Sequence, residues 1–210
     1  NMVVTNNSYT NANAGCPGEG AYDVVSNYVD KQMGDYEKLL HVFAAGNDGA
    51  LTCSPFPIKY ATIKSGYQVA KNVITVGALD TLYAAASFSS RGPVNDGRLK
   101  PEIMASGLNT LSTRHNFTYG TSSGTSMASP IVAGAATLLN EQYRKFNAGA
   151  LPQAALIKAV LCNTAEDLGN SGPDFTYGFG NLNARRAADA IENNRFWLST
   201  ATPASNTITV

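Results

Sequence analysis

Short apolar runs rich in β-branched residues alternate in this sequence with longer stretches of helical periodicity, and this alternation constrains the fold most. The predicted strands are Met2–Ser8, Val42–Ala45, Val73–Val76, Ala84–Phe88 and Ile103–Ala105; the predicted helices are Ala21–Leu40, a long stretch from Thr125, another from about Pro152, and Asn183–Glu192. Apolar strands that alternate with helices pair in parallel and are covered on both faces. We therefore predict an α/β fold with a doubly wound parallel sheet and helices on both faces.

The charge balance excludes two classes of partner. Fifteen Lys and Arg residues balance fifteen Asp and Glu residues, so the chain lacks the concentrated basic charge that nucleic acid or an anionic membrane requires. The longest apolar run, Pro130–Leu139, is about half the length that spans a bilayer and is interrupted by Gly134. We expect no nucleic-acid partner and no membrane partner.

Three cysteines cannot all pair within one chain. Cys162 follows the apolar helical stretch Leu156–Leu161, so we predict a buried, unreactive side chain. Cys16 and Cys53 lie in loop sequence rich in Gly and Pro. They either remain free or form a disulfide that would contribute about 3–4 kcal/mol. The sequence has no Cys-x-x-Cys motif and no histidine cluster, so no metal ligands are predicted.

The segment Gly124-Thr125-Ser126-Met127-Ala128-Ser129-Pro130 places a hydroxyl at the start of a buried helix. The N–H groups and the dipole at a helix N-terminus favour negative charge, such as an alkoxide or an oxyanion. By itself this pattern also fits a Thr or Ser that only caps the helix. The whole string, however, resembles the nucleophile motif of the subtilase family of serine peptidases. This resemblance implies that Ser126 is the nucleophile.

A second motif follows the strand Val42–Ala45, which ends in Gly46-Asn47-Asp48-Gly49. On its own this is an ordinary turn signal. The resemblance implies that Asn47 is catalytic and that its side-chain N–H joins the backbone N–H of Ser126 in binding an oxyanion. It also implies a substrate-binding set made of Ser8, Tyr9, Thr10, Ala44, Ala45, Gly46 and Thr125. Thr10 stands where the family usually has Gly.

The resemblance extends to about Asn194 and includes four further segments: Val73–Ala78, Phe88–Pro93, Lys100–Ile103 and Tyr177–Gly180. It implies that residues 1–195 are the C-terminal portion of a subtilase catalytic domain whose N-terminal part is missing. We interpret residues 196–210 as a linker and the start of a further β-rich module.

In subtilases the catalytic Asp and His precede the segment that this chain resembles. The two histidines here, His41 and His115, lie in no such motif, and we expect both to be structural or surface residues. A serine without a base is a poor nucleophile at neutral pH. We therefore expect the isolated chain to be inactive, with the missing segment of the same domain as its partner.

The resulting hypothesis is a serine endopeptidase that hydrolyses polypeptides through an acyl-enzyme on Ser126. The resemblance implies a secreted or extracytoplasmic location and allows calcium, although no cofactor is evident in the sequence. Two alternatives remain open: a pseudoprotease that binds peptides without cutting them, and a scaffold or adhesion module. We also expect the strand Met2–Ser8 to be left with an exposed edge through which the chain self-associates.

Overall fold

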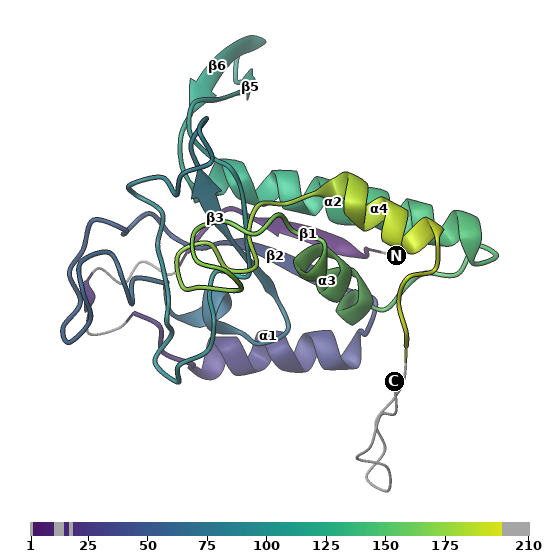
Figure 1. Cartoon of the computed structure of the whole chain (residues 1–210), viewed down its shortest axis with the longest axis horizontal. Coiled ribbons are helices and arrows are strands. Elements are labelled where there is room, and N and C mark those ends of the chain that lie inside the picture. The colour runs from purple at the N-terminus through teal and green to yellow at the C-terminus, as the bar shows by residue number, and fades with distance from the viewer. Residues whose placement is uncertain (1, 11–14, 17–18, 199–210) are drawn as a thin grey trace, which may run out of the picture.

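The computed structural model describes residues 2–10, 15–16 and 19–198. Its centre is a four-stranded parallel sheet in the order β1-β2-β3-β4 (Figure 1). The strands are β1 (Val4–Asn7), β2 (Leu40–Ala44), β3 (Ile74–Leu79) and β4 (Ile103–Ser106). The predicted parallel α/β architecture is therefore confirmed.

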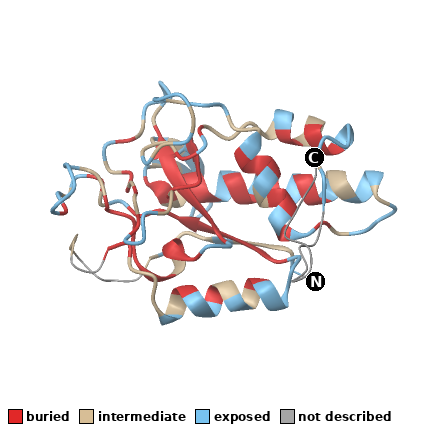
Figure 2. Cartoon of the chain, turned by 60° about the horizontal axis from the view of Figure 1, so that its bottom comes forward, coloured by how far each residue is buried: buried red, intermediate tan, exposed pale blue. Residues whose placement is uncertain are grey.

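Helices lie on both faces of this sheet (Figure 1). Helix α2 (Thr125–Phe146) contacts all four strands, and α3 (Ala154–Asn163) and α4 (Ala184–Glu192) pack against it. Helix α1 (Val24–Asp35) lies on the opposite side of the sheet from α2, next to the 3-10 turn η2 (Gly66–Val69). Figure 2 shows that the central strands of the sheet are buried and that the helices alternate buried and exposed sides; β2 and β3 are buried along their whole length, whereas β1 is only partly buried.

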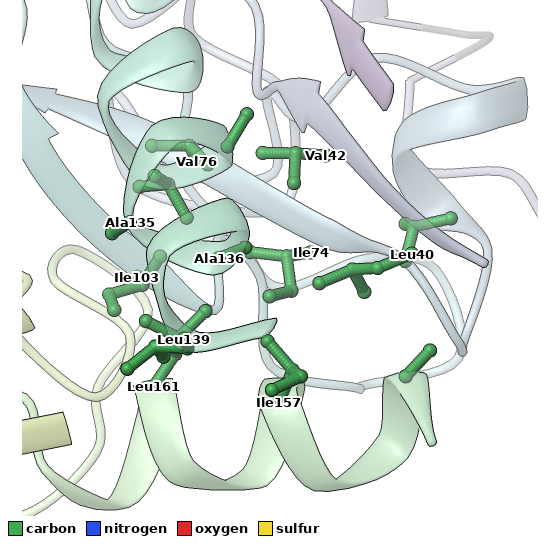
Figure 3. Packing of buried hydrophobic residues seen from close by; sticks show 14 of the residues in the cluster. Leu40, Val42, Ile74, Val76, Ile103, Ala135, Ala136, Leu139, Ile157 and Leu161 are labelled. Carbon is green, nitrogen blue, oxygen red and sulfur yellow. The ribbon is translucent and has the colours of Figure 1, made fainter. Parts of the chain in front are cut away.

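The main core lies between the sheet and the helices α2 and α3 (Figure 3). Alternate residues of the strands, such as Val42, Ile74 and Ile103, point towards α2. Small side chains on α2, including Ala135 and Ala136, allow the helix backbone to approach the sheet closely. This close approach determines how far the N-terminus of α2 lies from the carboxyl ends of the strands.

Two parts of the sequence interpretation are wrong. Residues 84–88 form a turn rather than a strand, with a single bridge from Ala85 to Leu79, because the side chain of Asp80 accepts hydrogen bonds from the N–H groups of Leu82 and Ala84. The antiparallel hairpin of β5 (Thr110–Arg114) and β6 (Thr118–Ser122) was not predicted. It projects from the body of the protein and buries little, so its sequence carries no apolar alternation.

The cysteines behave as two classes. Cys16 and Cys53 form a disulfide, which the sequence left open, and Cys162 is free and buried, as predicted. Most of the proposed linker and further module, 196–210, lies outside the described residues.

None of the helices in the described part of the chain is long and apolar enough to cross a membrane.

Strand β1 has one sheet neighbour among the described residues, β2. The N–H of Leu40 donates to the carbonyl of Val3, and in a parallel pair alternate residues direct both backbone groups to the same neighbour. Thr5 and Asn7 therefore face β2, whereas Val4 and Asn6 direct their N–H and C=O groups outward. This unpaired edge is a template for another strand.

We expect the isolated 210-residue chain to self-associate through β1, with light scattering showing species larger than a monomer as concentration rises. Val4→Pro removes an outward N–H without breaking the ladder to β2, so it should raise the monomer fraction. Thr5→Pro, which removes an inward N–H, is the matched control and should destabilise the fold. A wild-type chain that stays monomeric at high concentration would contradict the expectation.

Candidate active site

Ser126 is the second residue of α2 and is partly buried. The helix begins after Gly124, whose φ of 153° and ψ of 161° form a backbone conformation that L side chains rarely adopt. The parallel strands bring Ser8, which follows β1, and Asn47, which follows β2, to the same edge of the sheet. The structure thus brings together the predicted nucleophile, the predicted amide and part of the predicted substrate-binding set.

The side chain of Asn47 caps α2 from a different loop. Its Oδ1 accepts hydrogen bonds from the N–H of Thr125 at 2.9 Å and from the hydroxyl of Thr125 at 3.1 Å. Gly124, at the N-cap position, has no side chain that can do this. Because Oδ1 is used in this way, the orientation of the amide is fixed and its Nδ2 is directed elsewhere. Neither Nδ2 nor the N–H of Ser126 has an acceptor within the described part of the chain.

Pro130 explains a second link between α2 and β1. In a regular helix the carbonyl of Ser126 would accept from the N–H of residue 130, but proline has none. The hydroxyl of Ser8 donates to this carbonyl instead, at 2.9 Å. The hydroxyl of Ser126 donates in turn to the carbonyl of Ser8 at 3.3 Å, and the hydroxyl of Ser129 donates to Oδ1 of Asn6 at 2.8 Å.

The hydroxyl of Thr125 is fully buried and accepts a hydrogen bond from the N–H of Gly46 at 3.2 Å. It therefore ties the end of β2 to the start of α2. Its predicted contact with substrate stays a prediction. Ala44 and Ala45 are also buried, at the end of β2.

Tyr9 and Thr10 follow β1, and the ring of Tyr9 lies beside Phe43 of β2. The ring of Tyr9 packs edge-on against Phe43 and Tyr67, with centroids 6.0 and 5.6 Å away, and lines a cavity of about 370 Å³ next to α1. Its carbonyl accepts a hydrogen bond from Nε2 of Gln68 at 2.8 Å. Burial acts first, and nearby Tyr67 second, to raise the pKa of the Tyr9 hydroxyl above its ordinary value.

Neither histidine reaches Ser126. His41 is buried on the α1 side of the sheet, with Nδ1 2.6 Å from Oγ1 of Thr5 and Nε2 3.0 Å from Oε1 of Gln32. Burial lowers its pKa below the ordinary value. His115 is exposed in the turn between β5 and β6. The described residues therefore supply Ser126 with no histidine base.

A buried ion cluster next to Asn47 has no signal in the sequence. Nζ of Lys64 lies 2.5 Å from Oδ2 of Asp48 and 2.9 Å from Oε1 of Glu19. Burial acts to lower the pKa of Lys64, but the hydrogen bonds and charges of Asp48 and Glu19 outweigh it and raise the pKa overall. Across the described ranges no group of three or more His, Cys, Asp or Glu side chains lies together as a candidate metal site.

Comparisons with known proteins agree with the geometry. A model described as the subtilase family matches residues 1–180. The chain is 38% identical over 150 residues to subtilisin DY of Bacillus licheniformis, covering 70% of this chain and 46% of that protein. It is 36% identical over 165 residues to serine protease AprX of Bacillus subtilis (strain 168), covering 69% of this chain and 34% of that protein. The chain thus spans less than half the length of these curated relatives.

A solved structure, the self-cleaved protease domain of PatA, is similar with a TM-score of 0.69 and 25% identity. The match covers 91% of this chain and 62% of that chain.

The buried hydroxyl of Thr125 can be tested by Thr125→Val, which keeps the shape and removes the hydrogen bonds to Gly46 and Asn47. We expect the free energy of unfolding to fall by about 1–3 kcal/mol, because buried polar groups lose their partner. Thr137→Val on the exposed side of the same helix is the control and should change it by less than about 0.5 kcal/mol. Chemical denaturation followed by circular dichroism measures both; equal effects would refute the role of Thr125.

Proposed function

Because this chain belongs to the subtilase family, we propose that it is the nucleophile-bearing part of a serine endopeptidase acting on polypeptides through an acyl-enzyme on Ser126. The observation that carries the proposal is the start of α2. There a partly buried hydroxyl lies beside two N–H donors, from Ser126 and Asn47, that have no acceptor in the described chain. The disulfide Cys16–Cys53 supports an oxidising compartment and hence a secreted or extracytoplasmic location.

The chemistry follows from this arrangement. Oγ of Ser126 attacks the carbonyl carbon of the peptide bond, and its proton passes to a base. The carbonyl oxygen becomes an oxyanion, which the N–H of Ser126 and Nδ2 of Asn47 stabilise together with the positive end of α2. Collapse of the tetrahedral intermediate expels the protonated amine and leaves the acyl group on Ser126. Water then releases the acid and restores the hydroxyl.

We propose that the base comes from the rest of the complete protein. His41 is hydrogen-bonded to Thr5 and Gln32, and His115 lies in the turn between β5 and β6. In subtilisin, a relative, loss of the catalytic histidine lowers turnover by roughly 10⁶-fold. The chain by itself is therefore proposed to be inactive. The absence of a base also leaves a peptide-binding pseudoprotease as a second candidate, although such a protein has no need for two free donors beside a serine.

A fluorophosphonate probe tests the nucleophile. In the complete catalytic domain it should label Ser126 alone, and Ser126→Ala should abolish both labelling and peptide hydrolysis. The isolated 210 residues should show neither. Labelling at another residue, or turnover that survives Ser126→Ala, would overturn the assignment; an inactive complete domain would favour the pseudoprotease.

Two substitutions of Asn47 separate its two roles. Asn47→Leu removes both the cap and the donor, so in the complete domain it should lower kcat by about 10²–10³-fold and also reduce stability. Asn47→Asp keeps Oδ1 as an acceptor for Thr125 and replaces only the donor, so it should lose kcat by at least as much without losing stability. Steady-state kinetics and thermal unfolding measure both. Wild-type kcat in Asn47→Asp would remove Asn47 from the site.

A further inference from the structure

Lys64 and Glu19 form a buried ion pair that the core does not require. Their residues are 9% and 4% exposed, and the second carboxylate oxygen of Glu19, Oε2, is buried with no hydrogen-bond partner in the described part of the chain. Burying such charges usually costs about as much free energy as their attraction returns. The cluster is therefore poorly explained by fold stability alone.

Lys64 contacts the chain on both sides of Asn47. Its Nζ pairs with Asp48, the next residue, and its N–H donates to the carbonyl of Ala45 at 3.4 Å. Its aliphatic stem packs against Gly46 so closely that a Cβ on that glycine would lie 2.9 Å from Cγ of Lys64. The φ of Gly46 is 112°, so the turn is also in a conformation that favours glycine.

Ser90 supports the same turn from another side. Its N–H donates to the carbonyl of Gly46 at 3.1 Å, and its hydroxyl accepts from the N–H of Asp48 at 3.1 Å. The disulfide Cys16–Cys53 joins the loop that carries Glu19 to the loop that follows Asn47. The backbone of residues 46–48 is thus held by contacts with Lys64 and with Ser90.

We propose that Lys64, anchored by Glu19, is a positioning residue that holds the turn 46–48 so that Nδ2 of Asn47 stays directed at the developing oxyanion. The catalytic part of this inference rests on the proposed function. Lys64 touches no reacting atom and acts only through Asn47. An error of about 1 Å in the placement of a catalytic group can cost 10²-fold in rate, so loss of the ion pair should appear in kcat.

The kinetic test uses the complete catalytic domain. Lys64→Met should lower kcat by about 10-fold or more, up to the 10²–10³-fold lost with an oxyanion donor, and leave KM unchanged. Lys64→Arg should recover most of the rate because it keeps the charge. In the Asn47→Leu background, Lys64→Met should cause no further loss of kcat, since the two residues act as one unit. An unchanged kcat in Lys64→Met, or full additivity with Asn47→Leu, would overturn the proposal.

A second test does not depend on activity. The N–H of Thr125 is bonded to Oδ1 of Asn47, so its hydrogen exchange reports how firmly Asn47 is held. Lys64→Met should speed exchange at Thr125 by about 10-fold while exchange at Thr75, whose N–H is bonded to the remote carboxylate of Glu102, stays unchanged. Equal acceleration at both amides, or none at Thr125, would contradict positioning.

If Lys64→Met does not fold, the same kinetic and exchange measurements are made on Glu19→Gln, which removes the charge that anchors Lys64 with little change in side-chain volume. If the wild-type domain proves inactive while the exchange result holds, the proposed function fails and the positioning of Asn47 stands.

Discussion

The junction between the N-terminus of α2 and the carboxyl ends of β1 and β2 determines the rest of the site. It is made by hydrogen bonds from side chains in two loops: Oδ1 of Asn47 caps Thr125, and the hydroxyl of Ser8 satisfies the carbonyl that Pro130 leaves without a donor. The core beneath allows the junction, because alanines on α2 let the helix lie close to the strands. A larger side chain there would lift Ser126 away from both loops.

The side-chain amide of Asn47 both caps α2 and supplies the proposed oxyanion donor. Its oxygen completes a helix that would otherwise begin on an uncapped glycine, and this bond fixes the orientation of the amide that carries Nδ2. The proposed oxyanion donor is therefore held by the same interaction that starts α2. Because the group is oriented before any substrate arrives, little reorganisation is needed during the reaction.

The sheet could be predicted from the sequence because buried parallel strands appear there as continuous apolar runs, as in Val42–Ala45 and Val73–Val76. It missed the hairpin of β5 and β6, which buries too little to impose a pattern. Ser126 and Asn47 were predicted as site residues from their motifs, and the structure places Asn47 in hydrogen-bond contact with Thr125, the residue before Ser126; no motif shows that Asn47 caps Thr125. Lys64 and Glu19 are 45 positions apart in the sequence, so local sequence patterns cannot predict that they pair.

The contacts that build the site join distant parts of the chain. Ser8 and Ser126 are 118 positions apart, and Asn6 and Ser129 are 123 apart. Contacts of such high sequence separation form only after the intervening chain has been ordered, so they are late events in folding. A half-folded molecule therefore lacks the arrangement around Ser126. The proposed nucleophile and its neighbouring N–H donors are therefore brought together only in the compact molecule.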